Sequence, residues 1–198
     1  MERPFSQSCE NNKAPILEVL RRYFADVDFV LEVGSGTGQH AVHFAAELPH
    51  LRWQCCDQSE YLPGIRSWLD WAKLANTPAP LELNVNNPWP LASTAAIFSA
   101  NTLHIMSWEE VGKFFAAVAD VLADGGILCV YGPFNYRGSY TSDSNARFDQ
   151  WLKARDSASG IRDFEAIGEL ANRAGLQLLE DCEMPANNRC LVWRKLPG

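Results

Sequence analysis

Short apolar runs recur along the chain, and each has the length of a β-strand. Runs of this kind that are apolar on both faces are typical of strands covered by helices on both sides of a sheet. The last two runs are joined only by Met184–Arg189, which is too short for a parallel crossover, so we expect them to pair antiparallel. The predicted strands are Phe29–Val33, Leu51–Cys56, Leu81–Val85, Ala95–Ala100, Ile127–Tyr131, Leu176–Glu183 and Cys190–Arg194.

Stretches with helical periodicity lie between these runs. Ser107, followed three residues later by Glu110, predicts a capped helix start, and Asp124-Gly125-Gly126 predicts its end. The strands and helices alternate, which predicts an α/β fold: a Rossmann-like, seven-stranded, mostly parallel sheet with one antiparallel strand and helices on both faces. The other predicted helices are Ile16–Phe24, Gly38–Leu48, Tyr61–Ala75, Arg147–Arg155 and Phe164–Ala174, and Gly132–Ser144 is predicted to be a loop.

Composition narrows the possible classes of function. The 198 residues fit a single domain spanning 1–198, and 47% of them are hydrophobic, enough for a substantial core. The net charge of −7, without a basic cluster, argues against a nucleic-acid partner. The polar N-terminus lacks the apolar core of a secretory signal, and no continuous apolar stretch predicts a membrane span. The six cysteines form no Cys-x-x-Cys pair, so we expect a reduced, cytoplasmic protein.

The segment Leu31–His40 carries the sharpest functional signal. Its glycines, Gly34, Gly36 and Gly38, follow the first strand and open a helix, where a nucleotide-binding loop lies in such sheets. The spacing is G-x-G-x-G, one residue tighter than the dinucleotide fingerprint, and no G-K-[ST] ending is present. The loop therefore favours a nucleoside ligand without a pyrophosphate, although a tight turn alone is the alternative interpretation.

Two polar residues end the next two strands. Asp57 has the reach to accept hydrogen bonds from both hydroxyls of a ribose, and Asn84 can recognise the edge of an adenine. The alternative interpretations are a helix cap for Asp57 and a turn-forming residue for Asn84. Their order at successive strand ends favours the ligand-binding interpretation for the set.

At these residues the chain resembles the class I S-adenosylmethionine-dependent methyltransferases. Glu32-x-Gly34-x-Gly36-x-Gly38 is similar to their first motif, Asp57 to their ribose-binding acid, and Leu122–Gly126 to the turn before their fifth strand. The whole chain is also similar to the family called methyltransferase-like 26, or domain of unknown function 938. The stretches that carry this second resemblance are Pro4-Phe5, Glu10–Lys13, Asn101–His104, Tyr131–Phe134, Ser144-Asn145, Phe148-Asp149, Gly160–Asp163 and Met184–Asn188.

The resemblance implies the class I methyltransferase fold, S-adenosyl-L-methionine as cofactor and methyl transfer as the reaction. It leaves the acceptor open, and we expect a small molecule. One departure concerns the adenine-contacting position, where methyltransferases often carry Asp and this chain carries Asn84. The residues expected at the cofactor are Glu32, Gly34, Ser35, Gly36, Thr37, Gly38, Asp57, Asn84, Val85 and Asn101.

The acceptor site has no obligatory signature, because methyl transfer from a sulfonium can rely largely on positioning. Asn101-Thr102-Leu103-His104 follows the fourth strand and is not the [DN]-P-P-[YF] tetrapeptide of enzymes that methylate base or glutamine amines. His104 is the candidate base, with a structural residue as the alternative. His40 and His43 share a helix face without a third ligand, so we expect no metal. The candidate acceptor residues are Tyr131, Asn135, Asn187 and Asn188.

Two questions stay open from the sequence. The segment 1–26, with polar Ser8–Lys13 ahead of its helix, is a possible lid over the cofactor; loss of cofactor affinity on deleting residues 1–13 would support this. A catalytically silent module that binds S-adenosylmethionine or a partner, and an NAD(P)-dependent oxidoreductase, are the alternative functions. The glycine spacing disfavours the oxidoreductase.

Overall fold

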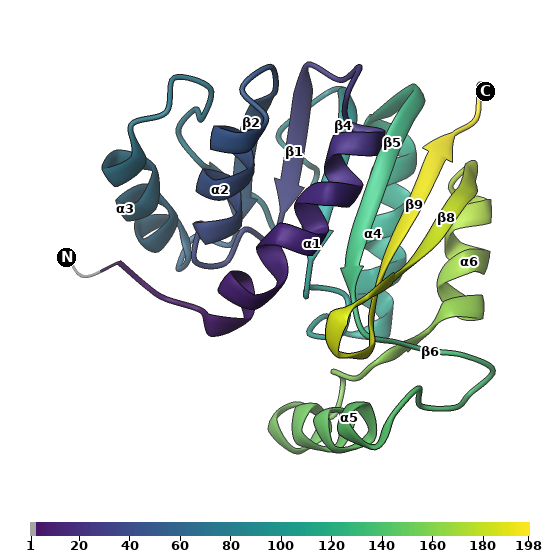
Figure 1. Cartoon of the computed structure of the whole chain (residues 1–198). Helices are drawn as coiled ribbons and strands as arrows, with labels where there is room; N and C mark the ends of the chain where they lie inside the picture. Colours follow the sequence, from purple (N-terminus) through teal and green to yellow (C-terminus); the bar gives the residue numbers. More distant parts are fainter. Residues whose placement is uncertain (1–2) are drawn as a thin grey trace.

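A computed structural model describes residues 3–198, built around one seven-stranded sheet (Figure 1). The strand order is β3-β2-β1-β4-β5-β9-β8. Within the described residues, β9 alone runs in the opposite direction to the other strands of this sheet. This confirms the predicted sheet, including the antiparallel pairing of the last two runs. The strands are β1 (Phe29–Val33), β2 (Arg52–Asp57), β3 (Leu81–Glu82), β4 (Thr94–Ala100), β5 (Leu122–Gly132), β8 (Leu176–Met184) and β9 (Asn188–Lys195).

Helices cover both faces of the sheet. The first three pack against one face, around Phe44, Trp53 and Phe98, and α4 and α6 pack against the other, around Phe114 and Trp193. α5 lies apart from both layers, beyond the carboxyl ends of the parallel strands (Figure 1). The helices are α1 (Gln7–Tyr23), α2 (Gln39–Glu47), α3 (Leu62–Ala72), α4 (Trp108–Val121), α5 (Asp143–Arg155) and α6 (Phe164–Arg173).

The capping box predicted for α4 is present. The Ser107 hydroxyl accepts a hydrogen bond from the Glu110 amide at 3.2 Å, and the Glu110 carboxylate accepts one from the Ser107 amide at 2.8 Å. The helix ends at Val121, before the expected stop, and β5 starts at Leu122. Asp124-Gly125-Gly126 therefore lies within a long strand rather than beyond a helix, because a register shift near Thr94 accommodates it beside β4.

The prediction that a polar segment precedes the first helix was wrong. Ser8–Lys13 is helical, since α1 already begins at Gln7, after Ser6 as its N-cap. Apolar periodicity starts only at Ile16 because the core begins there, whereas Ser8, Cys9, Asn11 and Asn12 of the preceding turns line a cavity.

The sequence pattern also failed to predict two short strands. β6 (Phe134–Asn135) and β7 (Arg162–Asp163) pair in a two-stranded parallel sheet inside and after the expected loop. Two residues are too few to show any periodicity. This small sheet attaches the chain around α5 to the end of β5.

Candidate active site

A cavity of about 820 Å³ lies at the carboxyl ends of the parallel strands, where ligands bind in open α/β sheets. The volume is in the range of small-molecule sites. Loops after β1, β2 and β4 form one end, and α5 with the β8–β9 hairpin forms the other. The predicted residues that line it are Gly34, Ser35, Gly36, Thr37, Asp57, Val85, Asn101, His104, Tyr131 and Asn188.

The glycine loop is held by backbone contacts that side chains would prevent. Gly34 has φ +76°, and a Cβ there would lie 2.7 Å from the Thr102 hydroxyl oxygen. Gly36 has φ +56°, and a Cβ there would meet no atom of the described residues within 4 Å, so the space beside its Cα is open. The amides of Gly34 and Ser35 donate to the Cys56 carbonyl at 3.0 and 3.1 Å. The loop is thus fixed to the end of β2 with its middle facing the cavity.

Gly38 has a structural position outside the cavity lining. It is the N-cap of α2 with φ 89°, and a Cβ there would lie 3.1 Å from the Ile65 Cα of α3. This glycine therefore allows α2 and α3 to approach each other.

Glu32 lies beneath the loop rather than in the cavity. Its carboxylate is 2% exposed and accepts hydrogen bonds from the Ser35 hydroxyl at 2.9 Å and the Trp53 indole at 3.1 Å. Burial raises its pKa to about 7, and the nearby charge of Asp57 acts in the same direction. Glu32 supports the loop from below through Ser35.

Asp57 contacts the glycine loop directly from the end of β2. Its carboxylate accepts hydrogen bonds from the Gly36 amide at 2.7 Å and the Gln58 amide at 2.8 Å. Burial raises its pKa above the ordinary value, partly offset by these two bonds. The N-cap of α3 is Tyr61, so Asp57 does not cap that helix. A half-buried carboxylate at the rim of a glycine loop is well placed for a polar ligand.

Asn84 forms its own turn. Its side-chain oxygen accepts a hydrogen bond from the Asn86 amide at 2.9 Å, and its carbonyl accepts one from the Asn87 amide at 2.9 Å. Asn84 does not line the cavity, whereas Val85 does. This geometry matches the turn-forming alternative, in which an asparagine side chain bonds to the backbone two residues ahead.

Asn101 and His104 lie on the turn after β4. Asn101 has the left-handed φ of 57°, and its amide donates to the Tyr131 carbonyl at 2.8 Å. The His104 ring is 5% exposed and meets the Phe148 ring edge-on at 5.3 Å. Burial, and secondarily the charge of Arg162, lower the His104 pKa to about 4. The imidazole is therefore neutral at pH 7, able to accept a hydrogen bond but a weak base.

A distant segment holds the His104 turn in place. Ser159–Arg162 supplies a donor to each carbonyl from Leu103 to Met106. The bonds run from the Arg162 guanidinium to Leu103 (3.1 Å) and Met106, from the Gly160 amide to His104 (2.9 Å), and from the Ser159 hydroxyl to Ile105 (2.7 Å). We call this set of bonds the carbonyl clamp. Sequence reasoning missed it, because only the Gly160–Asp163 marker drew attention to the segment.

Asp149 connects the carbonyl clamp to α5. Its carboxylate is 1% exposed and accepts hydrogen bonds from the Ile161 amide at 2.7 Å, the Tyr140 hydroxyl at 2.6 Å and Lys153 at 2.6 Å. The bonds from Lys153 and Tyr140 outweigh burial, and the pKa of Asp149 is lowered. The His104 turn, Ser159–Arg162 and α5 are thus one connected hydrogen-bonded unit.

The candidate acceptor residues divide into two groups. Tyr131 and Asn188 line the cavity; Tyr131 is 3% exposed, and burial raises its pKa to about 12. Asn135 and Asn187 lie outside the lining. Among residues 3–198, the buried side-chain oxygen of Asn135 in β6 has no hydrogen-bond partner. The Asn187 carbonyl accepts a hydrogen bond from the side-chain amide of Asn145 at 3.1 Å.

The start of α1, which the sequence predicts as part of a possible lid, forms a third wall of the cavity. Ser6, Cys9 and Asn12 line the cavity, and the Asn12 oxygen lies 2.6 Å from a ring nitrogen of His40. Gln39, 4% exposed, fastens this wall to the glycine loop. Its side chain accepts from the Ser6 amide at 2.5 Å and the Thr37 hydroxyl at 3.1 Å, and donates to Glu10 at 3.0 Å.

Replacing Gln39 by alanine should loosen the start of α1. The change removes the acceptor of the Ser6 amide and the donor to Glu10, a loss of about 1–2 kcal/mol of local stability. We expect amide hydrogen exchange, followed by mass spectrometry, to become about 5- to 30-fold faster around Ser6. Gln150→Ala, on the exposed face of α5, is the control. Unchanged exchange in Gln39→Ala would show that this contact does not hold the wall.

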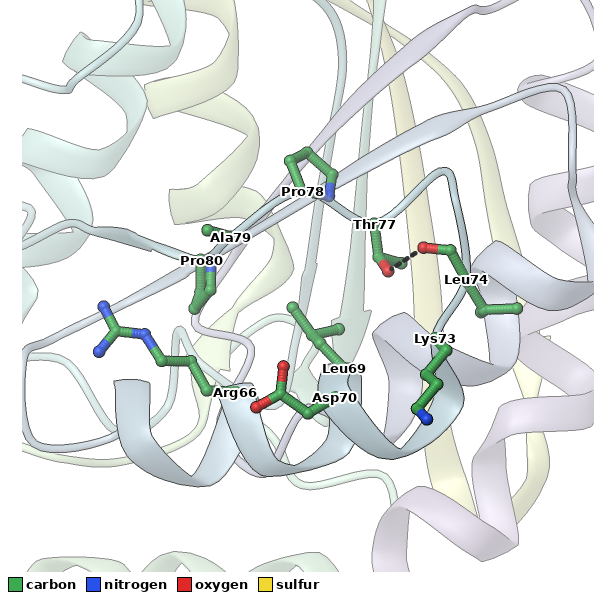
Figure 2. A pocket seen from close by; sticks show the side chains of 9 residues that line it. All are labelled: Arg66, Leu69, Asp70, Lys73, Leu74, Thr77, Pro78, Ala79 and Pro80. Atoms are coloured by element: carbon green, nitrogen blue, oxygen red, sulfur yellow. Dashed lines mark hydrogen bonds between the residues drawn. The ribbon is translucent and has the colours of Figure 1, made fainter.

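A second cavity, of about 620 Å³, lies between α3 and the loop that follows it (Figure 2). Arg66, Asp70 and Lys73 extend from α3 beside Thr77–Pro80. It shares no residue with the larger cavity. Residues 3–198 contain no cluster of three or more His, Cys, Asp or Glu that could hold a metal ion. None of the helices in that range is both long and apolar enough to cross a membrane.

Several solved methyltransferases are similar to this chain in fold. An O-methyltransferase family protein from Burkholderia thailandensis matches with a TM-score of 0.82 at 17% identity, over 94% of this chain and 57% of that one. An O-methyltransferase family 2 protein from Planctomyces limnophilus, in complex with apigenin, matches with 0.83 at 16%, over 94% and 57%. The S-adenosylmethionine-dependent methyltransferase SibL in its apo form matches with 0.79 at 19%, over 96% and 56%.

These likenesses establish the fold, and the chain spans a little over half the length of each of these proteins. A family model described as "Protein of unknown function (DUF938)" matches residues 3–195, nearly the whole chain. The stretches that carried the resemblance at the sequence level all lie within that range. The chain belongs to the DUF938 family.

Proposed function

We propose that this protein binds S-adenosyl-L-methionine and transfers its methyl group to a small molecule. The observation that carries the proposal is the single cavity that extends from the glycine loop and Asp57 to His104 and α5. A cofactor and an acceptor can therefore occupy adjoining parts of one space. The methyltransferase folds described above support the same reaction class.

The residues at one end of the cavity fit this cofactor. The Asp57 carboxylate has acceptor capacity beyond its two amide bonds, as a ribose diol requires. The open space at Gly36 lets a ligand approach the backbone. Leu83 and Val85 offer an apolar surface for an adenine ring. Asn84 lies in its own turn, so we assign adenine contact to Val85 instead.

The bound cofactor would supply an electrophilic methyl group on a sulfonium, a good leaving group. The chain's own contribution is then mainly positioning. His104, neutral at pH 7, can accept a hydrogen bond from an acceptor hydroxyl or amine and orient its lone pair. Asn145 and Asn188 can contact polar groups from the other side of the same end.

The proposal also covers the family assignment, the cellular location and the kind of partner. We assign the chain to methyltransferase-like 26 on the markers Asn101–His104 and Met184–Asn188. We also propose a cytoplasmic location, on the cysteine pattern, and a small-molecule rather than nucleic-acid partner, on the net charge of −7. The prediction of a single domain and of a lid formed by the start of α1 stays with this proposal.

Calorimetry tests the binding of the cofactor, and transfer of a methyl label tests the reaction. Titration with S-adenosylmethionine, S-adenosylhomocysteine and NADH should give binding of the first two only. Incubation with methyl-labelled cofactor and a metabolite extract should then give a labelled small molecule. NADH binding without S-adenosylmethionine binding would contradict the proposal. Cofactor binding without a labelled product in any fraction would favour the silent binding module.

A further inference from the structure

The acceptor end of the cavity differs in chemistry from the cofactor end. Its walls are Phe148 and Trp151 of α5, Ile105 and Met106 of the turn after β4, and Pro185 and Ala186 of the β8–β9 hairpin. Ile105 and Trp151 are 52% and 50% exposed, although both are large apolar side chains. Exposed apolar side chains gathered at the mouth of a cavity are typical of ligand-binding surfaces.

The two aromatic rings of α5 form an aromatic wall as a stacked pair. Phe148 and Trp151 are three residues apart on the same helix face, and their rings stack with centroids 5.8 Å apart and planes inclined by 17°. The His104 ring stands at 74° to Phe148. An apolar molecule in contact with this pair can therefore bring one polar group to His104.

Among residues 3–198, the lining of this end contains no cation, since the Arg155 guanidinium lies outside the lining, over the Trp151 ring. In the same range, no Lys or Arg lines the cavity, and its two carboxylates, Asp57 and Glu110, hydrogen-bond at the cofactor end and at the start of α4. An anionic acceptor would lose its hydration without gaining a counter-ion, which is costly.

A cation is equally disfavoured. The Arg155 guanidinium already lies over the Trp151 ring, 4.6 Å from its centroid, so the aromatic wall has its cation. A second positive group on this wall would face Arg155 without a carboxylate beside it. The remaining polar groups, Asn145, Asn188 and His104, suit an uncharged molecule with a few hydrogen-bonding atoms.

We infer that the methyl acceptor is an uncharged, largely apolar molecule, with the group to be methylated at the end that meets His104. This inference rests on the proposed methyl transfer and adds the chemical class of the acceptor. Phe148 and Trp151 determine specificity through apolar contact, and the lack of a counter-ion in the lining determines it against ionised analogues.

A matched set of naphthalene probes tests the inference. 2-Naphthol, 2-naphthoate and 2-naphthylmethylammonium share one ring system and differ in the charge of the substituent at pH 7.5. Binding is measured by equilibrium dialysis against protein saturated with S-adenosylhomocysteine. We expect 2-naphthol to bind at one site, at least about tenfold more tightly than either charged probe, a difference of about 1.4 kcal/mol or more. Equal or tighter binding of a charged probe, or no binding of 2-naphthol, would overturn the inference.

Variants locate the bound probe, and they distinguish a failure of this inference from a failure of the proposed function. Trp151→Ala should weaken 2-naphthol binding at least fivefold, Trp151→Phe should largely restore it, and the control Trp71→Ala, 56% exposed on α3, should leave it unchanged. An unaffected Trp151→Ala would overturn the inference while the cofactor function stands. Failure of the unmodified protein to bind S-adenosylhomocysteine would instead overturn the proposed function, before any probe is added.

Discussion

Replacing Asp57 by alanine is expected to weaken S-adenosylmethionine binding by about 5- to 150-fold, which corresponds to about 1–3 kcal/mol. Among residues 3–198, this carboxylate is the one charged group beside the glycine loop that faces the cavity, and bonds to a charged acceptor are stronger than those to a neutral one. Its removal leaves the ribose hydroxyls without this acceptor. Isothermal titration calorimetry with S-adenosylmethionine and S-adenosylhomocysteine measures the loss.

Asp57 also accepts a hydrogen bond from the Gly36 amide, so a control must separate the loss of the ribose contact from a change in the glycine loop. Asp57→Asn can keep one amide oxygen on Gly36 while removing the charge, and we expect it to lose affinity with little change in melting temperature. Asp70→Ala removes an exposed aspartate of α3 in the second cavity and should leave cofactor affinity unchanged. Equal affinity of Asp57→Ala and the unmodified protein would refute the ribose contact.

Replacing Glu32 by glutamine is expected to remove much of the loss of stability that accompanies a rise in pH from about 4.5 to about 7. Burial raises the pKa of Glu32 from 4.5 to about 7 in the folded state. Between these values the folded protein holds a proton that the unfolded chain has released. The free energy of unfolding therefore falls as pH rises through this interval, and the loss is complete above the folded pKa.

A pKa difference of this size corresponds to a contribution of about 3 kcal/mol between pH 4 and pH 8. Glutamine does not titrate, and its side-chain oxygen can still accept from Ser35 and Trp53. Urea unfolding across that pH range, without cofactor, should show the variant gaining stability relative to the unmodified protein as pH rises. Glu82→Gln, at an exposed position of β3, should follow the unmodified protein. Parallel curves for Glu32→Gln and the unmodified protein would contradict a raised pKa.

The sheet was predictable because each strand is marked by the residues within it and by the length of the links beside it. Buried strands such as Phe29–Val33 and Ile127–Tyr131 are continuous apolar runs, and the short link at Met184–Arg189 permits only an antiparallel pair. The glycine loop was equally readable, since its positive φ angles require glycine. The start of α1 was not, because its residues that line the cavity, such as Ser8 and Asn12, form no apolar stripe.

The site was predictable only where position along the chain decides it. Asp57 and Val85 line the cavity because strand ends meet at one edge of the sheet. Asn84 was expected at the end of a strand over Leu81–Val85, but β3 ends at Glu82, and the Asn84 side chain bonds within the turn that follows. Gln39 and Arg162 act through contacts with residues about 30 and 60 positions away, which no spacing pattern reveals.

The carbonyl clamp has an evolutionary consequence. It fixes the backbone of the His104 turn from the Ser159–Arg162 side, independently of the side chains that α5 turns toward the cavity. Trp151, which does not contact the clamp, can therefore be exchanged without displacing the backbone at His104 or the glycine loop. If the proposed function holds, related chains can accept new substrates by point changes on one helix, while the residues proposed for the cofactor stay as they are.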